Sequence, residues 1–212
     1  MGQAKRNRAR LMASPCRCQS SKPASECCFD GRQWHKTPAT LGLRCLPQNS
    51  VVDRCYMKEL GSCAGGISGE HLISKSIIEF PKLDGDFAIS GLPWLEEGES
   101  KILSSRNLTA NSLCSKHNSA LSPLDSAALS FFTALRACWV NEGMPLHYLV
   151  SGHDLERWLL KSLKVMAVSR NLARERTRLA GVFQEEVRLI DMLDDPSLWP
   201  KQTGLYFLMK PG

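Results

Sequence analysis

Residues 63–78 read CAGGISGEHLISKSII, and they place the charged pair Glu70 and His71 inside a run of otherwise small and apolar residues. The core of a helix or a strand does not require such a pair. A carboxylate and an imidazole are common metal ligands in proteins, and Cys63 supplies a thiol just upstream. The stretch therefore indicates a metal site.

The other half of this site is expected in residues 113–125, which read LCSKHNSALSPLD. This segment offers Cys114, His117 and Asn118. It leads into LDSAALSFFTALRACWV (residues 124–140), which lacks Gly and Pro and predicts one largely buried helix. We therefore expect these three polar residues at the start of a helix.

Together, over about residues 55–125, the two segments resemble the HNH family of ββα-metal nucleases. In that family an acidic residue and a histidine end the first strand, a hairpin follows, and a C-x-x-[CH]-N stretch opens the helix. The resemblance implies that Glu70 is the acidic metal ligand and His71 the general base. It implies that Asn118 binds the metal or orients the histidine. Mg²⁺ or Mn²⁺ is the expected catalytic ion, because hard cations prefer oxygen ligands.

The family often carries a structural zinc ion beside this site, and the resemblance implies Cys55, Cys63, Cys114 and His117 as its ligands. Seven residues separate Cys55 from Cys63, where the family usually has two. Cys45 therefore stays open as an alternative to Cys55. His117 replaces the usual cysteine, and both residue types bind zinc.

The family's middle asparagine falls at Thr109, counted back from Asn118, with Asn107 and Asn111 two residues to either side. Residues two apart on a strand share a face, so all three positions stay open. The alternative for the whole region is a structural zinc knot in which His71 is a hydrogen-bonded core histidine.

A second cysteine cluster, CRCQSSKPASECC, spans residues 16–28. Four thiolates within one short loop can surround a tetrahedral zinc ion, and metal binding then supplies most of the folding energy of so small a segment. The spacing resembles the SEC-C zinc-binding motif, with Gln19 where that family usually has Gly. The resemblance implies a zinc-held docking element with these ligands: Cys16, Cys18, Cys27 and Cys28.

The chain has 212 residues, 43% of them hydrophobic, a formal net charge of +6 and nine cysteines. The charge is compatible with a nucleic-acid partner. No run of 18 apolar residues and no secretory signal is present, so we expect a cytoplasmic protein of bacterial or phage type without a membrane partner. In a reducing compartment, the cysteines are more often metal ligands than disulfides. We expect Cys138 to be a buried free thiol.

We expect five segments: a basic arm (1–14), the SEC-C-like zinc knuckle (15–32), a linker (33–50), the HNH-like nuclease core (51–135) and a helical C-terminal region (136–212). The overall class is α+β, with a small ββα-metal core. Helical spacing in HDLERWLLKSLKVMAVS (residues 153–169) predicts a buried stripe, with Asp154 as the N-cap of that helix. GLYFLMK (204–210) predicts a short strand. The stripe consists of Leu155, Trp158, Leu159, Leu163 and Met166.

The basic arm reads as a helix, a disordered tail or a nucleic-acid contact. A second basic stretch reads as a solvated face or a phosphate contact; it contains Arg170, Arg174, Arg176 and Arg178.

These patterns predict a metal-dependent endonuclease that hydrolyses phosphodiester bonds of nucleic acid, with DNA favoured by family analogy. One or two structural zinc ions and a catalytic Mg²⁺ or Mn²⁺ are the expected cofactors. A protein partner docking on the N-terminal knuckle is a further expectation. The alternative is a non-enzymatic zinc module that binds nucleic acid or protein.

Overall fold

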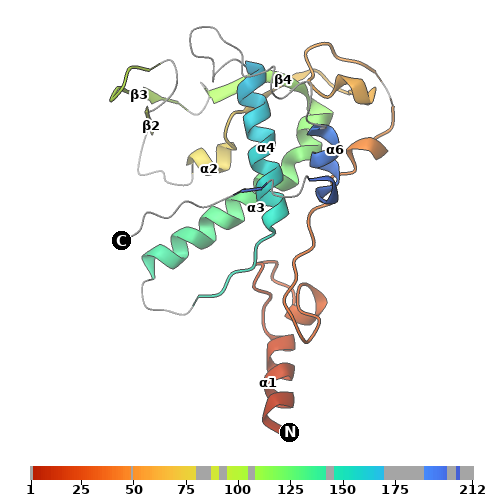
Figure 1. Ribbon diagram of the computed structural model, residues 1–212, viewed down its shortest axis with the longest axis vertical. Helices are drawn as coiled ribbons and strands as arrows, with labels where there is room; N and C mark the ends of the chain where they lie inside the picture. The colour runs from red at the N-terminus through yellow and green to blue at the C-terminus, as the bar shows by residue number, and fades with distance from the viewer. Residues whose placement is uncertain are drawn as a thin grey trace.

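The computed structural model describes residues 2–48, 50–79, 87–90, 95–104, 108–141, 146–169, 189–199 and 204–205. The helices are α1 (Gly2–Ala13), α2 (Lys75–Glu79), α3 (Ser115–Val140), α4 (Gly152–Ser169) and α6 (Leu189–Asp194). The strands are β1 (Ile67–His71), β2 (Phe87–Ser90), β3 (Ser100–Leu103) and β4 (Thr109–Cys114). Single 3-10 turns are η1 (Ala24–Glu26), η2 (Leu43–Cys45), η3 (Lys58–Leu60) and η5 (Pro196–Leu198). The combination of helices and two small sheets confirms the α+β class (Figure 1).

The strands form two separate antiparallel pairs, β1 with β4 and β2 with β3. In the first pair Ile67 lies opposite Cys114 and His71 lies opposite Thr109, with a register irregularity between Ser68 and Glu70. Helix α3 begins at the residue after β4. The start of β1 and the first turn of α3, which are far apart in the sequence, are therefore neighbours, and the Ser115 amide donates to the Gly66 carbonyl.

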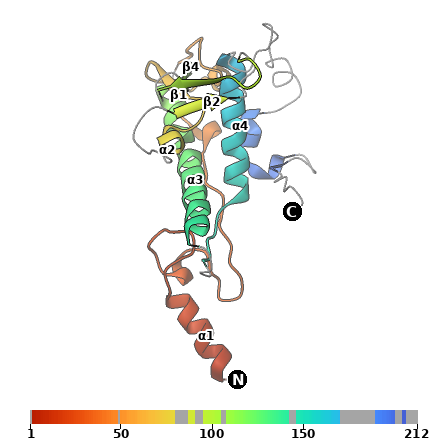
Figure 2. The ribbon, with the colours of Figure 1, turned by 90° about the vertical axis from the view of Figure 1, so that its left-hand side faces the viewer.

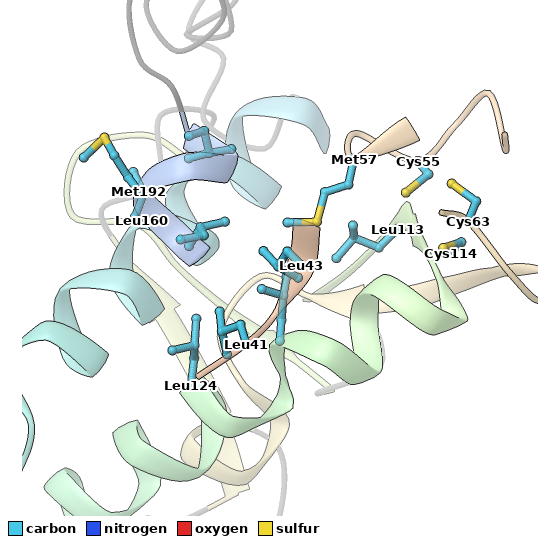
Figure 3. Close-up of a cluster of buried hydrophobic side chains, with 13 residues drawn as sticks. Leu41, Leu43, Cys55, Met57, Cys63, Leu113, Cys114, Leu124, Leu160 and Met192 are labelled. Carbon is cyan, nitrogen blue, oxygen red and sulfur yellow. The ribbon is translucent and has the colours of Figure 1, made fainter. Parts of the chain in front are cut away.

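One main core joins segments from most of the chain (Figure 3). Leu113, Leu121 and Leu124 are fully buried in it, and so is Leu43 from residues 33–50. The backbone amide of Leu43 also donates to the Asp194 carboxylate over 2.7 Å. The segment 33–50 therefore differs from the expected linker, because its apolar residues complete the core.

Helix α4 is covered on more than one side, because it packs against α3, β1, β4 and α6. In the predicted stripe Leu155 is buried, whereas Trp158, Leu159, Leu163 and Met166 are half-buried. The polar side of the helix is buried as well; its buried residues include Arg157, Lys161 and Lys164.

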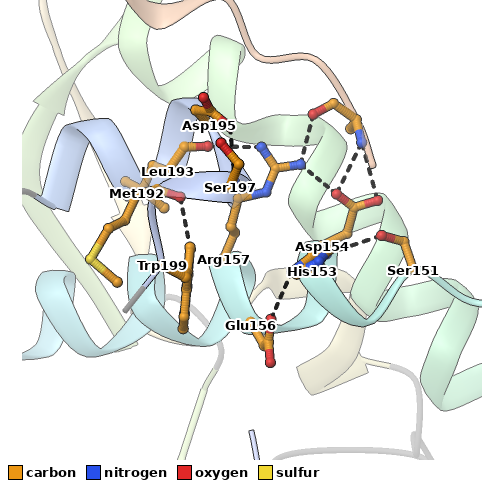
Figure 4. Close-up of polar contacts among 11 residues, drawn as sticks. Ser151, His153, Asp154, Glu156, Arg157, Met192, Leu193, Asp195, Ser197 and Trp199 are labelled. Atoms are coloured by element: carbon orange, nitrogen blue, oxygen red, sulfur yellow. Dashed lines mark hydrogen bonds and ion pairs between the residues drawn. The ribbon is translucent and has the colours of Figure 1, made fainter. Parts of the chain in front are cut away.

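The prediction of Asp154 as N-cap is wrong. Ser151 Oγ accepts a hydrogen bond from the Asp154 amide. The Asp154 carboxylate forms an ion pair with Arg157 and accepts a hydrogen bond from the Ala39 amide (Figure 4). Arg157 also donates to the carbonyl oxygens of Ala39 and Leu193. This network fastens the start of α4 to residues far away in the sequence, so Asp154 is used for tertiary contacts.

Helix α3 continues through Pro123 to Val140, and its last turns leave the core. Trp139 is 76% exposed, and Leu135 and Val140 are exposed too. The predictions of a largely buried helix and of a buried Cys138 are wrong at this end, because Cys138 is exposed. No packing partner in the described part of the chain covers these residues.

The N-terminal residues form a projecting part of the molecule. In Figures 1 and 2, α1 lies at one end of the long axis and the β1–β4 pair at the other. The expected basic arm is thus helical from Gly2 to Ala13, with no buried residue. The basic stretch 170–178 and most of GLYFLMK lie outside the described residues.

Candidate metal centres and the adjacent pocket

Cys55, Cys63, Cys114 and His117 form a buried group whose ligand atoms all lie within 4.8 Å of one another. The Sγ atoms of Cys55 and Cys114 are each 3.3 Å from His117 Nδ1, and that of Cys63 is 3.8 Å from it. A tetrahedral zinc ion with ordinary bond lengths separates a sulfur from a nitrogen ligand by about 3.6 Å. The group is therefore geometrically suited to hold a metal ion such as zinc.

Four structural elements bring these ligands together. Cys55 precedes η3, Cys63 bridges to Ser50, Cys114 ends β4 and His117 lies in the first turn of α3. The three sulfur atoms turn toward one another beside Leu113 (Figure 3). Ser62 Oγ lies 2.9 Å from His117 Nε2, which is the outer hydrogen bond that orients a metal-binding imidazole.

The alternative ligand Cys45 is exposed on η2 and is not a member of this group. The pKa values of Cys55, Cys114 and His117 are shifted in different directions. Burial raises the pKa of the Cys55 thiol to about 12. Burial also raises the pKa of Cys114, but hydrogen bonds from the His117 and Ala64 amides outweigh it and lower that pKa overall. Burial lowers the pKa of His117, which favours the neutral imidazole that metals require.

The second group consists of Cys16, Cys18, Cys27 and Cys28, whose sulfur atoms likewise lie within 4.8 Å of one another. Cys27 Sγ is 3.4 Å from Cys18 Sγ and 3.5 Å from Cys28 Sγ. Two sulfur ligands of one tetrahedral zinc ion are expected about 3.8 Å apart. This group too is geometrically suited to a metal ion such as zinc.

The loop between the two cysteine pairs uses left-handed backbone at Gln19 (φ 65°) and Ser21 (φ 61°). Glycine adopts this conformation without steric cost, whereas a residue with a Cβ, such as Gln19 or Ser21, adopts it at a cost. Burial raises the pKa of Cys18, but hydrogen bonds from Ser20 and the neighbouring thiols outweigh it and lower that pKa to about 6.

A pocket of about 440 Å³ lies at the end of β1, close to the four ligand residues Cys55, Cys63, Cys114 and His117, here called the Cys55 group. All three residues predicted to be catalytic line it: Glu70 and His71 from β1 and Asn118 from α3. Consecutive strand residues normally point to opposite faces. Glu70 and His71 nevertheless both line the pocket. A register irregularity lies beside Gly69, and such irregularities redirect side chains. The remaining lining residues are Gly69, Ser74, Lys75, Ser76 and Asp125.

Lys161 of α4 is buried beneath this pocket. Its Nζ lies 2.7 Å from Glu70 Oε1 and 2.7 Å from Asp125 Oδ2. Burial raises the pKa of Glu70, and the Lys161 charge opposes that shift. Ser74 Oγ donates to Asp125 and accepts from Trp158 Nε1. Two carboxylates therefore share one buried ammonium group at the edge of the pocket.

Asn118 donates from Nδ2 to Ser68 Oγ over 3.0 Å. Of the three positions considered for the middle residue, Thr109 and Asn111 lie on β4 and are not among the pocket-lining residues, whereas Asn107 lies outside the described residues. Sequence analysis missed Lys161, Asp125 and Ser74. The sequence around Lys161 does not indicate its role at the pocket, because that role depends on its contact with Glu70, which lies 91 positions earlier in the chain.

The chain was compared with models of known protein families, with curated proteins and with solved structures, and no match was found. None of the helices in the described ranges is long and apolar enough to cross a membrane.

Proposed function

We propose that the chain is a metal-dependent endonuclease of the HNH type, which hydrolyses phosphodiester bonds of nucleic acid and favours DNA. The single observation that carries this proposal is the shared pocket. Glu70, His71 and Asn118 come from two segments of the chain and line one cavity beside the Cys55 group. The paired strands β1 and β4 and the helix α3 also follow one another in the order of a ββα unit, with α2, β2 and β3 between the two strands.

The donor set of the pocket suits a hard divalent cation. It contains two carboxylates, Glu70 and Asp125, the amide of Asn118 and the hydroxyl of Ser74. Mg²⁺ and Mn²⁺ favour such oxygen donors. Lys161 contacts one oxygen of Glu70, but a carboxylate offers about four lone-pair sites and can serve a second cation. In this proposal Glu70 and Asn118 would hold the ion, and a divalent ion there would supply Lewis-acid stabilisation of the charge on the phosphate and the leaving oxygen.

His71 is the proposed general base. A neutral imidazole can accept a proton from the attacking water. Lys75 lines the same pocket and adds a positive charge where an anionic phosphate would lie. The Cys55 group, loaded with zinc, would hold β4 and α3 in place, so that Asn118 stays opposite β1.

The test is a plasmid assay with Mg²⁺ or Mn²⁺. The wild-type protein is expected to nick or linearise supercoiled plasmid, and His71→Ala to lose this activity by about 10²-fold or more, because general-base catalysis contributes about that much. His153→Ala is the matched control, since His153 lies on the exposed side of α4 next to Glu156. If His71→Ala cuts as well as wild type while retaining zinc, the proposed mechanism is wrong.

One observation favours the alternative, a zinc module without catalysis. Glu70 is paired with Lys161, and Asn118 with Ser68, as in a site whose polar groups serve stability alone. Manganese binding discriminates the two functions. The nuclease is expected to bind one exchangeable Mn²⁺, detected by electron paramagnetic resonance and lost in Asn118→Ala. The alternative predicts zinc alone.

A further inference from the structure

The positive charge of the chain is concentrated at its N-terminal end. Residues 2–36, here called the N-terminal module, contain eight Lys or Arg and two acidic residues. This excess of six positive charges equals the formal net charge of the whole chain, so the formal net charge of residues 37–212 is zero. A zinc ion held by four thiolates would reduce the local excess by two without removing any cation. The eight are Lys5, Arg6, Arg8, Arg10, Arg17, Lys22, Arg32 and Lys36.

Helix α1 divides these charges between two sides. At 100° per residue, Lys5, Arg6 and Arg10 fall within about 140° of one another, and Gln3 and Asn7 extend the same side. Arg8 lies about 60° beyond Lys5, outside the arc from Lys5 to Asn7, and its guanidinium closely covers Gly31 of the knuckle. The outer side of α1, which is this arc from Lys5 to Asn7, therefore presents cations, amides and small residues, without an acidic or large apolar side chain.

The knuckle adds a fixed cation and attaches the module to the body. The Arg17 guanidinium stacks on Trp34 at 4.4 Å from the ring centroid, and Trp34 stacks on Phe29. The Leu149 amide donates to the Arg17 carbonyl over 3.0 Å, just before α4 begins. The module is thus held at a defined end of α4, whose Lys161 reaches the pocket.

We infer that the N-terminal module binds the phosphate backbone of duplex nucleic acid through the outer side of α1, independently of base sequence. A row of side-chain cations is the electrostatic complement of a phosphate backbone. A membrane surface fits less well, because interfacial helices also carry a large apolar face. Here the exposed α1 residues other than Leu11 are polar, small or basic.

The distance between α1 and the pocket allows one duplex to contact both. Gly152 to Lys161 spans about 14 Å along α4, and α1 spans about 18 Å. Both views place α1 beyond the knuckle, away from the β1–β4 pair (Figures 1 and 2). The resulting reach of roughly 30–40 Å is about one turn of B-form DNA. The module would anchor a substrate whose next turn lies at the pocket.

The test measures binding of zinc-loaded, full-length His71→Ala protein to a fluorescent 24-bp DNA duplex between 50 and 200 mM salt. The variant Lys5→Gln/Arg6→Gln/Arg10→Gln keeps good helix formers. Losing three phosphate contacts is expected to reduce the salt slope by about 2.7, so the parent's affinity falls about 40-fold more than the variant's over this range. Lys58→Gln/Lys101→Gln/Arg136→Gln makes the same charge change at exposed positions of the body and is expected to keep the parent's slope.

Equal salt slopes for the parent and the α1 variant would overturn the inference. A reduction of the salt slope in the body variant as large as in the α1 variant would overturn it as well. Binding of vesicles with anionic lipid, lost in the α1 variant without any duplex binding, would overturn it in favour of a membrane. Circular dichroism and zinc content verify folding of each variant. The inference shares with the proposed function only the class of partner. Duplex binding without cleavage by wild type would refute the nuclease and leave the inference intact.

Discussion

Replacing Lys161 with Met removes the one ammonium group that two carboxylates share. Lys161 is 1% exposed and Glu70 is 4% exposed, while the Asp125 side chain is 28% exposed. Breaking a buried ion pair on one side costs about 3–5 kcal/mol, because the remaining charge stays buried without compensation. We therefore expect Lys161→Met to lower the free energy of unfolding by about that amount near pH 8.

This cost depends on pH in a defined direction. Burial raises the pKa of Glu70 and Lys161 opposes the rise, so removal of Lys161 raises that pKa further. The folded state then binds more protons than the unfolded state between the ordinary glutamate pKa and the raised one. Stability falls as pH increases through that window. The difference between Lys161→Met and wild type is therefore expected to be smaller at pH 6 than at pH 8.

Urea denaturation of both proteins at pH 6 and pH 8, with zinc present, measures this difference. Glu70→Gln added to Lys161→Met removes the unpaired charge and is expected to recover about 1–3 kcal/mol at pH 8. A Lys161→Met protein within 1 kcal/mol of wild type at pH 8 would refute the buried ion pair. A loss that is equal at both pH values would refute its assignment to Glu70 ionisation.

Four further outcomes are expected. His117→Cys keeps the zinc content of wild type by mass spectrometry, whereas His117→Ala loses one zinc per chain; retention by both would contradict the ligand group. Zinc affinity in a chelator competition falls by about tenfold or more from pH 8 to pH 6, because binding must displace the proton of Cys55, whose pKa burial raises to about 12; an unchanged affinity would be inconsistent with this. In zinc-loaded protein Cys45 and Cys138 react with maleimide and the grouped cysteines are protected, since these two are exposed and outside both groups; mass spectrometry showing more than two labels would contradict it. Gln19→Gly stabilises the knuckle by about 0.5–1 kcal/mol, because glycine adopts the left-handed conformation there freely; a less stable variant in thermal unfolding would oppose this.

The sequence alone brought Cys55, Cys63, Cys114 and His117 into one hypothesis, because ligand types and their order along the chain are local information. It did so for Glu70, His71 and Asn118 too, which line one pocket. Whether these groups bind the ions and act as proposed stays a prediction.

Tertiary contacts account for what sequence analysis missed. Periodicity along α4 predicted a helix with one buried stripe, but Lys161 and Arg157 on its polar side are buried as well. Their burial depends on carboxylates that come from β1 and α3 for Lys161 and from the first turn of α4 for Arg157. A hydrophobic pattern records which faces avoid water and contains no information on which distant charge neutralises a buried one. The burial of Leu43 depends on distant contacts too. Its segment contains Pro38, Gly42 and Pro47, but residues far away in the sequence pack against it in the core.

The two kinds of site in the body are mechanically coupled through shared elements. Helix α3 carries His117 of the cysteine group and, one residue on, Asn118 of the pocket. Strand β4 ends in Cys114 and is paired with β1, which carries Glu70 and His71. A metal ion at the first site would therefore fix the strand pair and the first turn of α3 relative to one another. Since a misplacement of about 1 Å can cost a reaction about 10²-fold, zinc bound outside the pocket would still govern the geometry inside it.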